Sequence, residues 1–143
     1  HDYQGNEAAW LDISKKHPWI FFPHYYYLQK MNAACFVGMD TNFYTRAFAP
    51  ESLRQRKWLK EIRTELKDCK LKVLYSHHPY LSKPGRRPAR GWLKDIYQDL
   101  VVGQYDVVVS GHDHILADLG KEKGTHFYLS GAGGRNDEVA GFL

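Results

Sequence analysis

Two short apolar runs that end in histidines constrain the fold of this chain more than any other feature of its sequence. Leu71–Tyr75 runs into Ser-His-His-Pro at 76–79, and Val107–Val109 runs into Ser-Gly-His-Asp-His at 110–114. An amphipathic helix is predicted between the two runs, because apolar residues recur at helical spacing from Trp92 to Leu100. A strand, a helix and a strand form the repeating unit of a parallel sheet, and ligands gather at the carboxyl ends of its strands. Both histidine clusters are therefore predicted to lie at one edge of a sheet.

Further helices and strands are predicted on either side of this unit. A helix is expected over Glu7–Lys16, with Asn6 as its N-cap and Pro18 beyond its end. Two strands joined by a turn come next, Pro50 then opens a helix with an apolar stripe, and a hairpin closes the pattern. The residues assigned are Tyr25–Gln29 and Ala33–Met39 for the strands, Leu53, Leu59, Ile62 and Leu66 for the stripe, and Ile115–Leu119 and His126–Leu129 for the hairpin, with its turn at Gly120–Gly124. The predicted class is α/β.

The positive charge of the chain is concentrated in one stretch. The 143 residues include 20 Lys and Arg against 16 Asp and Glu, which gives a formal charge of +4. Lys83, Arg86, Arg87 and Arg90 lie within eight residues that contain no acid. Nucleic-acid-binding proteins usually spread positive charge along a face, so one basic loop fits the anionic group of a small molecule at least as well. The hydrophobic content of 43% excludes a disordered chain.

The cysteines and the isolated histidines are less informative. Cys35 and Cys69 are too few for a disulfide scaffold and too far apart for a zinc knuckle, and they leave the redox compartment open. His17, His24 and His126 are interpreted as surface or partly buried residues.

The clustered histidines are candidate metal ligands, because imidazole binds iron, zinc and manganese well. His112 and His114 point the same way if the backbone stays extended after the strand, and they splay apart if it turns. A polar turn with two incidental histidines is the alternative. Asp113 is expected to orient one ring through a hydrogen bond. His77 reaches the same edge of the sheet, and His78 is interpreted as a supporting ring rather than as a ligand.

Five short motifs, in order along the chain, carry a resemblance to a known family. They are His1-Asp2 as the end of a Gly-Asn-His-Asp motif, Met39-Asp40-Thr41, Ser76-His77-His78-Pro79, Gly111-His112-Asp113-His114, and Leu129-Ser130-Gly131-Ala132-Gly133. With these motifs the chain resembles the calcineurin-like metallophosphoesterases, and among them the tartrate-resistant (purple) acid phosphatase branch. The resemblance implies the C-terminal part of a four-layer α/β/β/α sandwich of mixed sheets. Residues 1–143 would then be the C-terminal part of a single metallophosphoesterase domain.

The resemblance also implies a reaction, the hydrolysis of a phosphomonoester at a dinuclear metal centre in which iron is paired with iron, zinc or manganese. His77 and His112 would bind one metal and His114 the other, while a metal-bound hydroxide attacks phosphorus and His1 acts as an outer-shell acid. The residues expected to support these ligands are Asp2, His78 and Asp113. The protein is therefore expected to be a metal-dependent phosphatase of acid phosphatase type, and to be secreted, lysosomal or lumenal.

Departures from the family pattern bear on what the chain can do alone. It begins inside the Gly-Asn-His-Asp motif, so two aspartates, a tyrosine and an asparagine that bind metal in the family are missing. Ser76 replaces a glycine. Arg86 stands where the family has a pocket histidine, so Arg86 and Arg87 are predicted to line the phosphate pocket, with a solvated basic loop as the alternative. The chain alone is expected to be inactive, and to need the missing N-terminal half or self-association to cover its sheet.

Two other functions stay open on the sequence. One is a catalytically silent, phosphatase-like scaffold or anchor protein, which the missing ligands allow. The other, less favoured, is a phosphodiesterase that acts on nucleotides or nucleic acid through the basic loop. No nucleic-acid partner is expected, and no apolar run is long enough to span a membrane.

Overall fold

The computed structural model describes residues 8–45, 50–133 and 138–139. Its strands form one mixed sheet in the order β1-β2-β3-β4-β6-β5-β7. The strands are β1 Tyr27–Met31, β2 Ala34–Met39, β3 Leu71–Ser76, β4 Val107–Ser110, β5 Ile115–Glu122, β6 Thr125–Ser130 and β7 Glu138–Val139. The helices are α1 Ala8–Lys16, the 3-10 helix η1 Thr41–Thr45, α2 Pro50–Glu61, α3 Arg63–Leu66 and α4 Gly91–Leu100. The predicted α/β class is confirmed.

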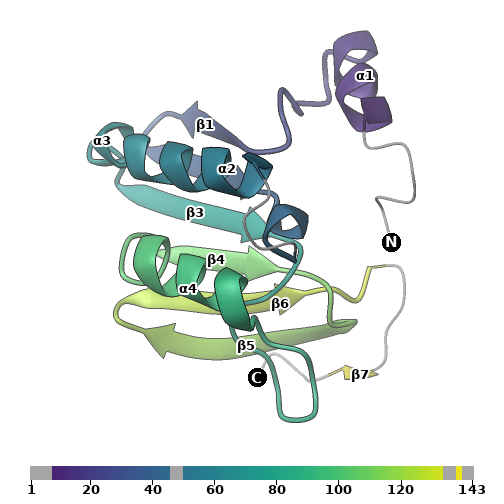
Figure 1. Ribbon diagram of the computed structural model, residues 1–143, viewed down its shortest axis with the longest axis vertical. Helices are drawn as coiled ribbons and strands as arrows, with labels where there is room; N and C mark the ends of the chain where they lie inside the picture. Colours follow the sequence, from purple (N-terminus) through teal and green to yellow (C-terminus); the bar gives the residue numbers. More distant parts are fainter. Residues whose placement is uncertain (1–7, 46–49, 134–137, 140–143) are drawn as a thin grey trace.

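The centre of the sheet is parallel. Strands β2, β3, β4 and β6 run in the same direction, whereas β1 pairs antiparallel with β2 and β5 pairs antiparallel with β6. The short edge strand β7 pairs parallel with β5. The crossover from β2 to β3 contains η1, α2 and α3, and the crossover from β3 to β4 contains α4. The parallel strands therefore end at the same edge, on the right in Figure 1. Ser76 at the end of β3 pairs with Ser110 at the end of β4, so the segments after both strands leave the sheet side by side.

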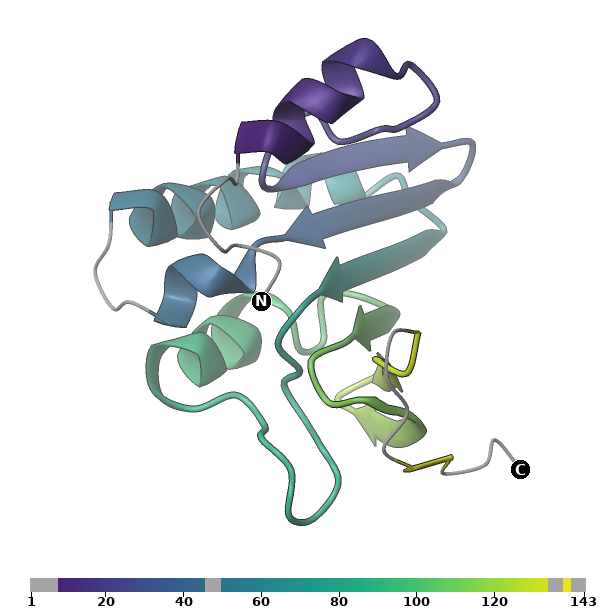
Figure 2. The ribbon, with the colours of Figure 1, turned by 90° about the vertical axis from the view of Figure 1, so that its right-hand side faces the viewer.

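One face of the sheet carries the hydrophobic core. Helices α2 and α4 lie on this face (Figures 1 and 2). Alternate residues of the central strands point into the core, where Val37, Leu74 and Val108 are at most 1% exposed. They belong to one buried cluster with Leu59 of α2 and Ile96 of α4. The apolar stripes of the two helices thus meet the inward-facing residues of the strands and form one α layer on one β layer.

The opposite face of the sheet has no helix over it among the described residues (Figure 2). A row of side chains, Tyr27, Gly38, Tyr75, Val109 and Tyr128, is paired residue by residue across β1, β2, β3, β4 and β6 on this face. The hydroxyls of Tyr27 and Tyr75 lie 2.5 Å apart. Gly38 leaves room for both rings, because a Cβ there would lie 3.0 Å from the Tyr27 ring and 3.3 Å from the Tyr75 ring. The face is therefore largely apolar.

The α2 stripe differs from the predicted one at its beginning. Leu59, Ile62 and Leu66 are buried as predicted, but Leu53 is 47% exposed. The buried residue on this turn is Gln55, whose amide oxygen accepts from the Asp40 backbone N–H at 2.8 Å and whose amide nitrogen donates to the Asp40 carbonyl at 2.8 Å. A buried amide with both bonds made carries no desolvation penalty for an unpaired group, so glutamine replaces leucine in the core here.

Strand ends also differ from the prediction. Strand β1 runs from Tyr27 rather than Tyr25, and β5 extends into the first part of the predicted Gly120–Gly124 turn and ends at Glu122. The register of β5 shifts between Asp118 and Lys121, and Gly120 there has a φ of 77°. The Gly120 region is therefore a bulge within the strand, and the hairpin turns later, at Lys123 and Gly124.

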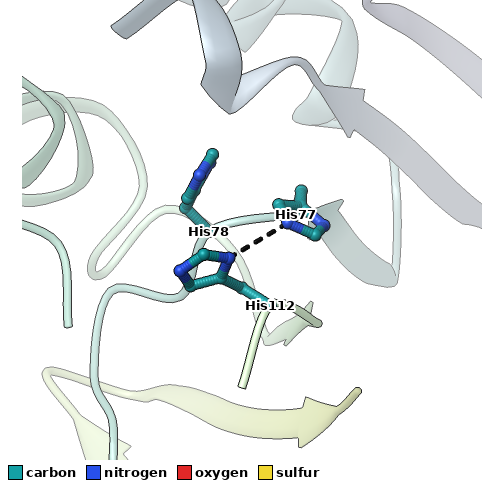
Figure 3. A group of neighbouring side chains, drawn as sticks. All are labelled: His77, His78 and His112. Atoms are coloured by element: carbon teal, nitrogen blue, oxygen red, sulfur yellow. Dashed lines mark hydrogen bonds between the residues drawn. The ribbon is translucent and has the colours of Figure 1, made fainter. Parts of the chain in front are cut away.

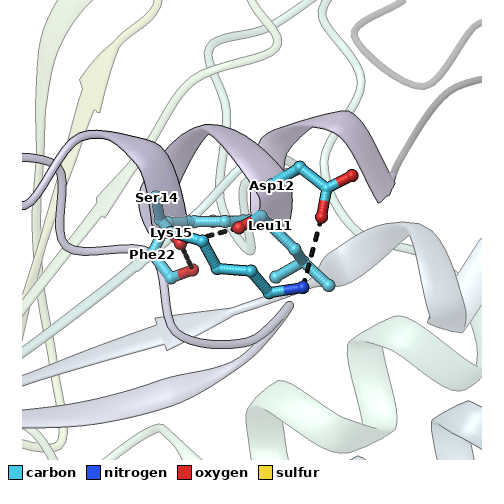
Figure 4. Close-up of polar contacts among 5 residues, drawn as sticks. All are labelled: Leu11, Asp12, Ser14, Lys15 and Phe22. Carbon is cyan, nitrogen blue, oxygen red and sulfur yellow. Dashed lines mark hydrogen bonds and ion pairs between the residues drawn. The ribbon is translucent and has the colours of Figure 1, made fainter.

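Helix α1 begins at Ala8 and lies beyond the β1 edge of the sheet (Figure 1). The Ser14 hydroxyl lies 2.9 Å from the carbonyl oxygen of Leu11 and 2.8 Å from that of Phe22 (Figure 4). Lys15 forms an exposed ion pair with Asp12 at 3.2 Å. The Ser14 contact fixes the segment that leads from α1 to β1. The predicted N-cap and start of this helix, Asn6 and Glu7, lie outside the described residues.

Cys35 of β2 and Cys69, between α3 and β3, form a disulfide with their Cα atoms 5.8 Å apart. The sequence left the state of these cysteines open, and the structure pairs them. The bridge joins residues 34 positions apart. Within the described residues, no helix is both long enough and apolar enough for a membrane span.

Candidate metal site

Three histidines meet at the carboxyl edge of the sheet. Ring nitrogens of His77, His78 and His112, one from each residue, all lie within 4.8 Å of one another. Figure 3 shows the three rings gathered in the space beyond β3. The Nε2 atom of His77 and the Nδ1 atom of His112 are 3.1 Å apart. We call these three residues the histidine group.

The histidine group is held by the ends of β3 and β4. The Gly111 N–H donates to the His77 carbonyl at 3.1 Å, which joins the two segments directly beyond the strands. Tyr97 of α4 is fully buried, and its hydroxyl donates to the His78 carbonyl at 2.7 Å. The same hydroxyl lies 2.6 Å from Oγ of Ser76. The serine that replaces a family glycine thus has a partner in α4, and the helix packs directly against the histidine segment.

The backbone at His112 turns sharply. His112 has a φ of 65°, in the left-handed region that a non-glycine residue rarely adopts. The Asp113 N–H donates to the Gly111 carbonyl at 2.8 Å, and the buried Asp113 carboxylate accepts from the Ser82 hydroxyl. Gly131 lies against this turn, because a Cβ on Gly131 would be 2.1 Å from the Asp113 carbonyl oxygen. A strained backbone conformation of this kind persists only where surrounding contacts hold it. Here the two hydrogen bonds of Asp113 and the contact with Gly131 hold the turn.

Burial lowers the pKa of two rings of this group, His78 and His112. The pKa of His78 is lowered to about 4, first by burial and then by the neighbouring rings of His77 and His112. The pKa of His112 is also lowered by burial, and Arg87 lowers it further, while Asp113 acts in the opposite direction. Neutral imidazole is the form that binds a metal ion, so the site favours the ligand form well below pH 7.

In the metal-free protein, we expect the His78 ring to titrate with a midpoint near pH 4, about 2.5 pH units below an exposed histidine. The unfolded chain takes up this proton near pH 6.5, so the contribution of His78 to stability is present above that pH and is lost as the pH falls toward 4. An NMR titration of the ring protons measures the midpoint. A His78 midpoint at or above 6 would contradict the prediction.

The structure brings two of the three predicted metal ligands into the histidine group. His77 and His112 are brought together, whereas His114, half-buried just before β5, is not part of the histidine group. His78, interpreted from sequence as a supporting ring, lies with the other two. The His112 backbone turns, so His112 and His114 follow the splayed arrangement rather than the extended one. His1 and Asp2 lie outside the described residues, so the predicted catalytic acid and one supporting residue stay predictions.

The other predicted residues lie near the histidine group. Asp113 is expected to orient a histidine ring, and this stays a prediction. In the structure its carboxylate accepts from the Ser82 hydroxyl, which joins the His112 turn to the loop before α4. Arg86 is half-buried and Arg87 is exposed. Both line a cavity of about 710 Å³ that His78 and His112 also border.

Thr41 belongs to one of the five sequence motifs, but sequence reasoning assigned it no role at the site. Its Oγ1 accepts from the His78 backbone N–H at 3.0 Å and lies 2.8 Å from Nδ1 of the His78 ring. These bonds fix the ring and leave Nε2 as its remaining nitrogen. Thr41 follows β2, the parallel neighbour of β3, so its place at the carboxyl end of a strand is the signal that could have found it.

The donor set fits one metal ion. Two imidazole nitrogens bound to one tetrahedral zinc, each about 2.1 Å from it, are about 3.3 Å apart, close to the 3.1 Å between His77 and His112. The remaining nitrogen of His78 adds a third donor of a type that suits zinc and iron. The group contains no carboxylate among the described residues.

A second cavity, of about 350 Å³, is bordered by His77 and Asp40 on the side of the uncovered sheet face.

Solved structures share this architecture. GAP50, "the anchor in the inner membrane complex of Plasmodium", superposes with a TM-score of 0.67 at 18% identity, over 96% of this chain and 48% of GAP50. The purple acid phosphatase PPD1 from seeds of yellow lupin (Lupinus luteus) superposes with a TM-score of 0.58 at 18% identity, over 87% of this chain and 27% of the lupin chain. The fold is metallophosphoesterase-like. No protein-family model matches the sequence, and no curated protein does.

The metallophosphoesterase-like fold agrees with the resemblance seen in the sequence motifs, and at this level of identity the likeness extends to the fold alone. The chain spans 48% of the length of GAP50 and 27% of the length of the lupin enzyme.

Proposed function

We propose that this chain supplies the histidine side of the metal centre of a phosphatase that hydrolyses phosphomonoesters. The observation that carries the proposal is the His77–His112 nitrogen pair, 3.1 Å apart at the carboxyl edge of a metallophosphoesterase-like sheet. His78 adds a donor from the same segment. Such an edge is where open α/β sheets bind their ligands.

In this proposal, His77 and His112 hold one metal ion with His78 as a third donor, and His114 serves a second ion. Iron paired with iron, zinc or manganese suits imidazole ligands. Metal ions bound here would polarise phosphate oxygens and lower the pKa of water. The role of His1 is to donate a proton to the leaving group. Arg86 and Arg87 contribute fixed positive charge on the side of the larger cavity, where phosphate is bound.

We further propose that residues 1–143 are the C-terminal part of a single metallophosphoesterase domain. Two observations support this. The apolar face opposite α2 and α4 is without a helix over it in the described part, and this chain spans only about half of GAP50, 48% of its length. A second sheet on that face would complete the four layers and bring the carboxylate ligands that the histidine group lacks.

The Cys35–Cys69 bridge supports a proposed place for the protein outside the reducing cytosol, in the secretory, lysosomal or extracellular space. Structural disulfides persist in oxidising compartments. The bridge is formed by a core residue, since Cys35 is only 1% exposed.

Metal binding by the 143-residue chain tests the proposal. We expect His77→Ala and His112→Ala each to weaken zinc binding by about 100-fold or more, because each removes a donor of the closest nitrogen pair. Competition with a chromophoric chelator measures the affinity. His126→Ala is the matched control, because His126 pairs with Val107 at the opposite end of the parallel strands, and its effect is expected to be below about twofold. Equal losses of zinc affinity in all three variants would contradict the proposed metal site.

A second candidate function, a partner-binding anchor without turnover, is favoured by the superposition of 96% of this chain on GAP50. The two functions differ in the behaviour of the longer protein that would contain this chain. A phosphatase releases phosphate from p-nitrophenyl phosphate with a kcat of about 1 s⁻¹ or more once metal is added. An anchor binds metal through the same histidines without this turnover. The 143-residue chain alone is expected to show no turnover in either case.

A further inference from the structure

The larger cavity beside the histidine group has an unusual lining. It measures about 710 Å³ and lies between the loop before α4, the first turn of α4, and the rings of His78 and His112. Arg86, Arg87 and Arg90 line it, and no acidic side chain does so within the described residues. We call it the arginine cavity. Its volume lies in the range of pockets that enclose small-molecule ligands, about 300 to 1,000 Å³.

Two of the arginines that line the cavity, Arg87 and Arg90, form no ion pair with an acidic side chain within the described residues. Elsewhere, Arg54 pairs with Glu51 at 3.3 Å and Arg56 with Asp99 at 3.1 Å. Arg87 and His112 border the same cavity. The guanidinium groups of Arg87 and Arg90 therefore favour a ligand with several negative charges.

The loop that carries these arginines is fixed at both ends. The Ala89 N–H donates to the Pro79 carbonyl at 2.8 Å, and Ala89 is buried. Ser82 is bound to the Asp113 carboxylate in the His112 turn. The arginines are therefore presented from a closed, anchored loop, and the histidine group and the arginine cavity are mechanically joined. A site ordered in advance binds a charged ligand at a lower entropic cost.

We propose that the arginine cavity binds the further phosphate groups of a substrate that carries two or more phosphates, while the phosphate to be removed lies at the histidine group. The inference rests on the proposed phosphatase function and names its substrate class. Guanidinium groups bind phosphate oxygens bidentately, and the first turn of α4, Gly91 to Leu93, borders the same cavity. A nucleic-acid backbone is the less suitable ligand, because the arginines surround a hollow beside the site and do not extend along a face.

Calorimetric titration of the 143-residue chain with tripolyphosphate, in EDTA, tests the cavity without metal. We expect tripolyphosphate to bind about tenfold or more tightly than orthophosphate, because it engages several guanidinium groups at once. The double variant Arg87→Gln, Arg90→Gln is expected to lose this preference. Lys83→Gln is the matched control, because Lys83 lies in the same loop but does not line the cavity, and it should change the affinity by less than about twofold.

The inference is overturned if tripolyphosphate and orthophosphate bind equally, if the double variant behaves like Lys83→Gln, or if a single-stranded oligonucleotide binds more tightly than tripolyphosphate. Should the double variant fail to fold, Arg87→Lys keeps the charge but loses the planar fork, and it is expected to weaken tripolyphosphate binding about threefold or more. Loss of zinc binding in His77→Ala is measured separately. If His77→Ala binds zinc as tightly as the unsubstituted chain, while the preference for tripolyphosphate is intact, the proposed metal centre is overturned. The proposed anion site in the arginine cavity is then unaffected.

Discussion

Gly131→Ala is expected to displace the His112 turn and to lower the free energy of unfolding by about 3 kcal/mol or more. A Cβ at this position would lie 2.1 Å from the Asp113 carbonyl oxygen and 2.9 Å from its carbonyl carbon. These are backbone atoms, and the turn that holds them is already fixed by the Gly111–Asp113 hydrogen bond and by Ser82. The clash cannot be relieved by a change of rotamer, so either β6 or the turn must move.

The matched control is Gly133→Ala, two residues further on, where a Cβ would meet nothing within 4 Å. Urea unfolding followed by fluorescence measures the stability, and the zinc affinity reports on the histidine group. The Gly131 variant should lose both stability and zinc affinity, whereas the Gly133 variant should keep both. Equal stability of the two variants would mean that the close packing of the Asp113 backbone against residue 131 does not require glycine there.

Much of the fold could be predicted from sequence because it depends on local patterns. The runs at Leu71 and Val107 are short, apolar and separated by an amphipathic helix, and this pattern allows little other than two parallel strands with a crossover. Because parallel strands end at one edge, the meeting of His77 and His112 follows from topology alone. The prediction needed no knowledge of side-chain contacts.

What could not be predicted depends on contacts between distant residues. Gln55 is buried because its amide matches the backbone of Asp40, 15 positions earlier, and helical periodicity favours Leu53 for the same turn. The left-handed backbone at His112 depends on the room left by Gly131, which lies in another strand's segment. The place of His78 in the histidine group depends on Thr41, which fixes its ring from beyond β2.

The role of the arginines shows the same limit. The sequence indicated a basic loop that either lines a phosphate pocket or faces water. The choice depends on where the loop closes, and the hydrogen bond from Ala89 to Pro79 closes it beside the histidine group. The charge of the arginines and their position beside the histidine group together favour a role in phosphate binding, which their charge alone left open.

Removal of the disulfide is the second substitution with a large expected effect. Cys35→Ala with Cys69→Ala is expected to lower the free energy of unfolding by about 4 kcal/mol, since the bridge closes a loop of 34 positions and so restricts the unfolded chain. Alanine is preferred to serine because Cys35 is in the core, where an unpaired hydroxyl would add a separate cost.

The control is the unsubstituted chain treated with a reducing agent, which breaks the same bond without changing volume in the core. Guanidinium unfolding of the oxidised chain, the reduced chain and the double variant measures the three stabilities. Agreement between the reduced chain and the double variant, both well below the oxidised chain, would assign the loss to the bridge itself. A protein that gains about half of a typical domain stability from this bond requires an oxidising compartment to keep that stability. A loss below about 1 kcal/mol on reduction would remove that requirement, and with it the support that the bridge gives to a secreted or lumenal location.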